Sequence, residues 1–172
     1  MAERAPSHPT LVSAARRLGR ALVKRRWQLA TAESCTGGLL GHVITDVPRS
    51  SDHYLGGVVT YSNLLKEELL GVDAALLERT GAVSADVAEA MAAGLLERFE
   101  IASLALAVTG IAGPDGGTAE KPVGLVYVAA MARGGPARVE RRIWPHDRNG
   151  NKRASVLLAL ELGAALSSDG DG

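Results

Sequence analysis

The sequence predicts an α/β fold, in which a mixed sheet of parallel and antiparallel strands is flanked by helices within a single domain. Apolar runs of strand length are interspersed with segments of helical periodicity along the chain. Over residues 124–144, two strand-like runs are separated by a short turn, as in an antiparallel hairpin. The 172 residues suit one domain with a real core, and they contain no repeat or linker.

Composition and charge exclude several classes of protein. Hydrophobic residues make up 47% of the chain and aromatic residues only 3%, so the core must consist mainly of aliphatic side chains. The 19 basic side chains balance 19 acidic ones, which argues against a nucleic-acid partner. The single cysteine excludes an internal disulfide. Because the sequence has no signal peptide and no apolar run of bilayer length, we expect a cytoplasmic protein without a membrane partner.

The N-terminal part should form a flexible arm followed by a helix. Residues 1–9 are polar and contain two prolines, as expected of a loose arm. Thr10 can cap a helix whose apolar stripe would consist of Leu11, Ala14, Leu18 and Leu22. We expect the domain to cover residues 10–166 and the polar residues 167–172 to form a disordered tail.

The stretch Thr31–Gly41 is predicted to form a tight turn between a strand over residues 27–30 and a helix. It follows the run 27–30 and leads into the apolar segment 39–44. Such a turn presents small side chains at the edge of a sheet, beside the free N–H groups of the helix start.

Three adjacent side chains in this turn, Ser34, Cys35 and Thr36, carry a hydroxyl or a thiol, and Gly37 and Gly38 leave the backbone accessible. One interpretation is a nucleophile beside donors for an oxyanion. The other is an ordinary helix cap followed by glycines.

The middle of the chain should supply a second strand and several helices. Residues 57–62 read as a strand, Asn63 begins a short helix that carries Lys66, and 74–80 form another helical piece. Ser84 is expected to cap a longer helix, whose apolar stripe consists of Val87, Met91, Leu95 and Phe99.

The C-terminal half should contain a buried strand, a long loop, the hairpin and a last helix. Residues 104–109 are apolar and end directly in the loop Gly110–Pro122, which has four glycines. Such a loop can hold a phosphate or a planar ligand, although it matches neither the P-loop nor the dinucleotide fingerprint, and a plain surface turn is the alternative. After the hairpin and the polar turn 145–151, the last helix is expected over 151–166.

Histidines offer little chemistry in this sequence. None of the four has a metal-binding spacing, and His42 with Asp46, one helical turn apart, is expected to form a surface pair. A Ser-His-Asp triad stays open but is not favoured.

Lysine is then the remaining base: Lys66 lies between an apolar strand and apolar residues, where burial would lower its pKa from about 10.4. Tyr61 could relay a proton or orient the amine.

Separate blocks in a fixed order carry a resemblance to a known family. They are AESCTGG at 32–38, GGVVTYSN at 56–63, KEELLGV at 66–72, GAVS at 81–84, TGIAGPDGGTAEKPVG at 109–124 and DR at 147–148. From about Leu11 to Ala165 the chain resembles the CinA C-terminal domain family, whose active members are nicotinamide mononucleotide deamidases. The resemblance implies a small-molecule nucleotide substrate and no metal or organic cofactor. We also expect a homo-oligomer, with a dimer as the preferred state.

The resemblance also implies roles for individual residues. Ser34 would be the nucleophile and Lys66 its general base, with Tyr61 assisting, in hydrolysis of the nicotinamide carboxamide to nicotinic acid mononucleotide and ammonia. The substrate-binding residues would be backbone donors around Thr36, Gly37 and Gly38, the nucleotide side at Thr109, Gly110 and Gly113, and Arg148 near the phosphate.

Three positions depart from the family pattern: His146 stands in place of a glycine, Lys152 in place of an arginine, and Ala119 where a proline is frequent. These departures concern the residues expected to contact the phosphate. The further N-terminal domain that many family members carry is expected to be absent. Two other functions stay open: an amidase with Cys35 as the nucleophile, and a non-catalytic regulatory or partner-binding module.

Overall fold

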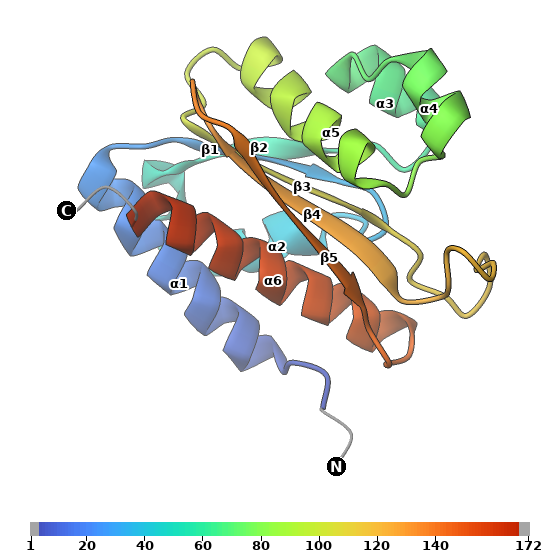
Figure 1. Cartoon of the computed structure of the whole chain (residues 1–172). Coiled ribbons are helices and arrows are strands. Elements are labelled where there is room, and N and C mark those ends of the chain that lie inside the picture. Colours follow the sequence, from blue (N-terminus) through green and yellow to red (C-terminus); the bar gives the residue numbers. More distant parts are fainter. Residues whose placement is uncertain (1–3, 169–172) are drawn as a thin grey trace.

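The computed structural model describes residues 4–168, and the helices and strands in this range form a single layered α/β unit (Figure 1). The helices are α1 (His8–Arg25), α2 (Leu39–Thr45), α3 (Asn63–Leu70), α4 (Ala74–Thr80), α5 (Ala85–Arg98) and α6 (Arg148–Ser168). The strands are β1 (Leu29–Glu33), β2 (Tyr54–Val59), β3 (Leu104–Gly110), β4 (Leu125–Ala132) and β5 (Ala137–Ile143).

The five described strands form one mixed sheet, as the sequence predicts. Their order is β2-β1-β3-β4-β5. Strand β1 pairs in parallel with β2 and β3, whereas β4 pairs antiparallel with β3 and with β5 in the expected hairpin.

Helices cover both faces of the sheet (Figure 1). Helices α1, α2 and α6 lie on one face, over an apolar cluster that includes Leu18, Leu106 and Leu160. Helices α3, α4 and α5 lie on the other face, over a cluster that includes Met91 and Leu95. Strand β3 is buried from both sides, which explains its continuous apolar sequence.

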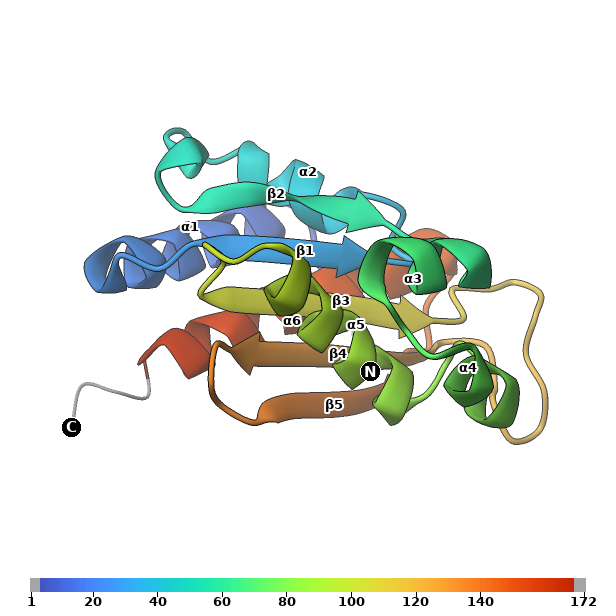
Figure 2. The ribbon, with the colours of Figure 1, turned by 90° about the horizontal axis from the view of Figure 1, so that it is seen from above.

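The connections between the parallel strands determine where a ligand can bind. The link from β1 to β2 passes through α2 on one face, and the link from β2 to β3 passes through α3, α4 and α5 on the other. In Figure 2 the arrowheads of β1, β2 and β3 point to the same end of the sheet, next to α3, α4 and the long loop after β3. Ligands of open α/β sheets bind outside the carboxyl ends of the strands, where the connections reverse direction.

Several helix boundaries differ from those expected from the sequence. Helix α1 begins at His8 rather than after Thr10, because the Ser7 side chain accepts the Thr10 N–H and serves as the N-cap. Helix α6 begins at Arg148, not at residue 151, and continues through Ser168. Residues 167 and 168 are thus helical instead of disordered, and residues 1–3 and 169–172 lie outside the described part of the chain.

Three further expectations were wrong in detail. Strand β2 begins and ends three residues before the expected range 57–62, and strand β1 extends through Glu33 instead of ending at Ala30. Phe99 is 39% exposed rather than part of the core, because α5 ends at Arg98 and the chain turns away there. The expected Ser84 cap is confirmed, since its side chain accepts the Val87 N–H.

Among residues 4–168, no helix combines the length and the apolar character that a membrane span requires.

Candidate active site

Ser34 is the first residue after β1, at the carboxyl end of the parallel strands. Its N–H donates to the Val108 carbonyl of β3, and the side chain is buried. The preceding Glu33 is also buried, and its carboxylate accepts the N–H groups of Gly38, Leu40 and Gly41. This carboxylate satisfies the free donors at the start of α2 and so holds the turn that carries Ser34.

Lys66 approaches Ser34 from the neighbouring crossover. The Ser62 side chain caps α3 by accepting the Leu65 N–H, and the helix turns Lys66 and Leu70 inward, one helical turn apart. Lys66 has 0% of its surface exposed. Its Nζ lies 3.2 Å from Ser34 Oγ, so the separation expected from the sequence is found.

The surroundings of Lys66 bear on the protonation state of its amine. Burial lowers the pKa of Lys66 from its ordinary value, and no carboxylate pairs with it among the described residues. Nζ donates to the carbonyls of Thr60 at 2.8 Å and Tyr61 at 3.4 Å. Nζ is also the donor of the 3.2 Å hydrogen bond to Ser34 Oγ, so these three acceptors match the three N–H groups of the ammonium form. In the neutral form, two N–H groups would serve the two carbonyls and the lone pair would face the Ser34 hydroxyl. In that neutral form, the amine is placed to take the proton of Ser34.

Cys35 is unsuited to act as a nucleophile. Its side chain is buried, and that burial raises the pKa of the thiol to about 12. Since the thiolate is the nucleophilic form, this burial disfavours Cys35 as a nucleophile.

The backbone donors expected for an oxyanion are largely occupied. The Gly37 N–H donates to the Ser34 carbonyl, and the Gly38 N–H donates to Glu33. Gly37 and Gly38 both have positive φ, so their role in the structure is to allow the tight turn. Of the three expected positions, only the Thr36 N–H has no partner among residues 4–168.

A cavity of about 240 Å³ opens beside Ser34 and Lys66. The rest of its wall comes from Tyr61 and Arg148, from the end of β3, from the loop that follows β3 and from the segment before α5. These residues are Tyr61, Ala82, Val83, Thr109, Gly110, Ile111, Ala112, Gly113, Asp115, Gly116 and Arg148, together with Cys35. Thr36, Gly37 and Gly38 do not line it.

Two wall residues, Ala82 and Val83, were missed as site residues by the sequence reasoning. The buried Thr109 hydroxyl donates to the Ala82 carbonyl at 2.7 Å, which ties the segment before α5 to the end of β3. The signal was available, because GAVS at 81–84 is one of the blocks shared with the family.

The glycines of the long loop serve its close packing. A Cβ on Gly110 would lie 2.7 Å from the Leu125 carbonyl oxygen. Gly113 has a φ of +87°, and a Cβ there would lie 2.4 Å from Val123 Cγ1. Both positions therefore require glycine for the loop to fold against β4 and form the cavity wall.

Tyr61 and Arg148 form the rim of the cavity. Arg148 is the first residue of α6, and its guanidinium donates to the Gly113 carbonyl and, at 3.3 Å, to the Tyr61 hydroxyl. Tyr61 is 61% exposed. Within the described range its hydroxyl makes no hydrogen bond to Ser34 or Lys66, so it lies with the arginine rather than with the expected nucleophile and base.

With this geometry in place, comparison with known proteins identifies the family. A family model described as the CinA C-terminal domain matches residues 12–166. The chain belongs to the CinA C-terminal domain family. The resemblance noted in the sequence is thereby confirmed.

Curated relatives of this CinA domain are considerably longer proteins. A CinA-like protein of Mycolicibacterium paratuberculosis is 51% identical over 156 residues, covering 88% of this chain and 35% of the relative. A putative competence-damage inducible protein of Halothermothrix orenii is 49% identical over 135 residues, covering 78% of this chain and 32% of the relative. The chain spans about a third of the length of these relatives.

Solved structures confirm the fold. The competence/damage inducible protein CihA from Agrobacterium tumefaciens has a TM-score of 0.90 and 41% identity, covering 98% of this chain and 100% of that one. The competence damage-inducible protein A from Klebsiella pneumoniae has a TM-score of 0.84 and 36% identity, covering 91% of this chain and 94% of that one.

Proposed function

We propose that this CinA domain hydrolyses the carboxamide of nicotinamide mononucleotide to nicotinic acid mononucleotide and ammonia. The observation that carries the proposal is the buried Lys66 amine at hydrogen-bond distance from Ser34 Oγ, beside a cavity. A serine activated by a neutral amine attacks acyl carbons, and the family resemblance implies that the acyl group is an amide.

The reaction proceeds in two steps. Ser34 Oγ attacks the amide carbon while Lys66 Nζ takes the hydroxyl proton. The C–N bond then breaks, the lysine returns the proton to the leaving nitrogen, and ammonia departs from an acyl-enzyme. Water next attacks the ester carbon as Lys66 takes its proton, and the Ser34 oxygen leaves and regains that proton.

The cavity and its rim would bind different parts of the substrate. At about 240 Å³ the cavity is smaller than the roughly 300–1,000 Å³ of ordinary ligand pockets, so it suits the pyridine carboxamide. The ribose and phosphate would then extend to the rim, where the Arg148 guanidinium matches phosphate geometry.

Ammonia release from nicotinamide mononucleotide by the purified protein tests this function. We expect turnover by the wild type and a fall in kcat of at least about 1,000-fold in Ser34→Ala, as in other serine hydrolases that lose the nucleophile. The matched control is Cys35→Ala, which should stay within a few-fold of the wild type. No ammonia from the wild type, or loss of activity in Cys35→Ala with retention in Ser34→Ala, contradicts the proposal.

A non-catalytic regulatory or partner-binding module is the second candidate. The observation in its favour is that relatives are named for competence and damage induction rather than for a reaction. A protein of that kind would bind the nucleotide, or nothing, without releasing ammonia. The Ser34–Lys66 contact favours the enzyme, because a module of that kind needs neither a hydroxyl nor a buried amine at that position.

A further inference from the structure

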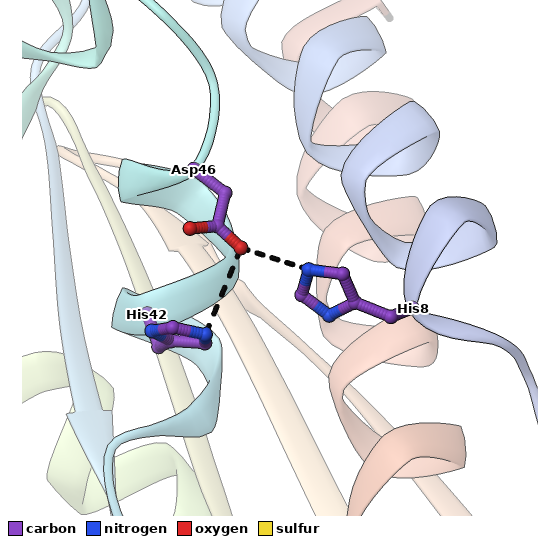
Figure 3. A group of neighbouring side chains, drawn as sticks. All are labelled: His8, His42 and Asp46. Atoms are coloured by element: carbon purple, nitrogen blue, oxygen red, sulfur yellow. Dashed lines mark ion pairs between the residues drawn. The ribbon is translucent and has the colours of Figure 1, made fainter.

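Three side chains with metal-binding atoms meet on the surface, away from the cavity described above. His8 Nε2 lies 2.9 Å from Asp46 Oδ2, and His42 Nε2 lies 3.6 Å from the same oxygen (Figure 3). One candidate ligand atom from each of the three residues lies within 4.8 Å of the other two. The sequence predicts the His42–Asp46 pair, which is confirmed, but gives no sign that His8 joins it.

Helices α1 and α2 hold the three residues in place. His42 and Asp46 are one turn apart at the end of α2, and His8 is the first residue of α1, which packs against α2. The two imidazole rings tilt by 39° with their centroids 6.0 Å apart, on either side of the carboxylate (Figure 3). All three side chains are exposed, so an ion can enter without any opening of the fold.

The spacing fits a tetrahedral ion. Ligands about 2.0–2.1 Å from Zn²⁺ at tetrahedral angles lie about 3.3 Å from one another. The two measured nitrogen–oxygen distances, 2.9 and 3.6 Å, fall on either side of that value. The third distance, between one nitrogen of each imidazole, is within 4.8 Å.

We propose that His8, His42 and Asp46 form a binding site for a divalent transition-metal ion such as Zn²⁺. Two imidazoles and one carboxylate suit Zn²⁺, Co²⁺, Ni²⁺ or Cu²⁺, whereas Mg²⁺ and Ca²⁺ require mostly oxygen ligands. Three protein ligands leave the fourth position to water. The ion would tie the start of α1 to the end of α2, and the deamidase mechanism does not require it.

Zinc titration of the untagged protein, followed by calorimetry and native mass spectrometry, tests the site directly. We expect one ion per chain. His42→Ala and Asp46→Asn should weaken binding by at least the roughly 10–100-fold that loss of an outer-shell partner costs. Both positions are exposed, so the variants should fold. His146→Gln is the matched control, since it removes a histidine from another part of the surface and should bind like the wild type.

Thermal unfolding gives a second readout. Because the three ligands come together only in the folded chain, Zn²⁺ at about 100 times its Kd should raise the folding equilibrium constant about 100-fold. Because the ion displaces protons from its imidazole ligands, the rise should be larger near pH 7.5 than near pH 5.5. Mg²⁺ should have no effect. Equal zinc binding by the wild type and His42→Ala, or equal loss in His146→Gln, overturns the proposal.

Discussion

Lys66 Nζ and Ser34 Oγ lie 3.2 Å apart, although 32 residues separate them in the chain. The contact exists because β1 and β2 are parallel neighbours, so the turn after each strand lies at the same end of the sheet. Ser34 follows β1 directly, and α3 brings Lys66 back from the end of β2. The topology of three elements thus creates the proposed catalytic pair.

Replacement of Lys66 should abolish activity and change the pH dependence of stability. Lys66→Met lacks a base and Lys66→Arg stays protonated, so kcat should fall by about 100-fold or more in both. The pKa of Lys66 is lower in the folded protein than its ordinary value of about 10.4. At pH values between these two pKa values, Lys66 is protonated in the unfolded chain but neutral in the folded protein. Raising the pH in that window therefore stabilises the wild type.

Urea unfolding at a series of pH values measures this linkage. The free energy of unfolding of the wild type, minus that of Lys66→Met, should rise by up to about 1.4 kcal/mol per pH unit inside the window. A difference that stays constant up to pH 10 means that Lys66 is charged in the folded protein, contrary to the mechanism.

Glu33 should be important for both the fold and the rate. Its carboxylate accepts three backbone N–H groups at the start of α2, and a glutamine amide cannot accept all three. We expect Glu33→Gln to lower the free energy of unfolding by about 1–3 kcal/mol and to lower kcat, because the turn that carries Ser34 loosens. The control is Glu68→Gln on the exposed face of α3, which should change neither. Equal stability of the two variants would show that the contacts at Glu33 contribute little.

Arg148 and Tyr61 should act together on substrate binding. Arg148→Ala should raise KM more than it lowers kcat, because a phosphate contact remote from the amide binds ground and transition states equally. Tyr61→Phe should raise KM less, and the double variant should show less than the summed effects, since the two side chains share a hydrogen bond. If Tyr61→Phe lowers kcat at unchanged KM, the hydroxyl takes part in proton transfer instead.

Local signals made much of the fold predictable. The Ser84 cap, the glycine-rich turn after Ser34 and the apolar run of β3 depend on neighbours in sequence, and the structure has each of them. The burial of Lys66 had a local sign as well, since its partner one turn away on the inner face is Leu70.

Features that depend on contacts between separate elements were missed. The sequence does not reveal that Glu33, at the end of a buried strand, occupies the Gly38 N–H that was expected to serve an oxyanion. Nor does it reveal that His8 reaches Asp46, because that contact requires the packing of α1 against α2. Tyr61 was expected beside the base, yet its exposed ring turns toward Arg148, from a helix far along the chain.

The pH dependence of kcat/KM for ammonia release from nicotinamide mononucleotide tests the central claim most directly. If neutral Lys66 is the base, kcat/KM should rise tenfold per pH unit up to an apparent pKa below the ordinary value for lysine, and then level off. This rise should be missing from the residual activity of Lys66→Met. A profile without the rise, or the same rise in Lys66→Met, would contradict the assignment of Lys66 as the base that activates Ser34.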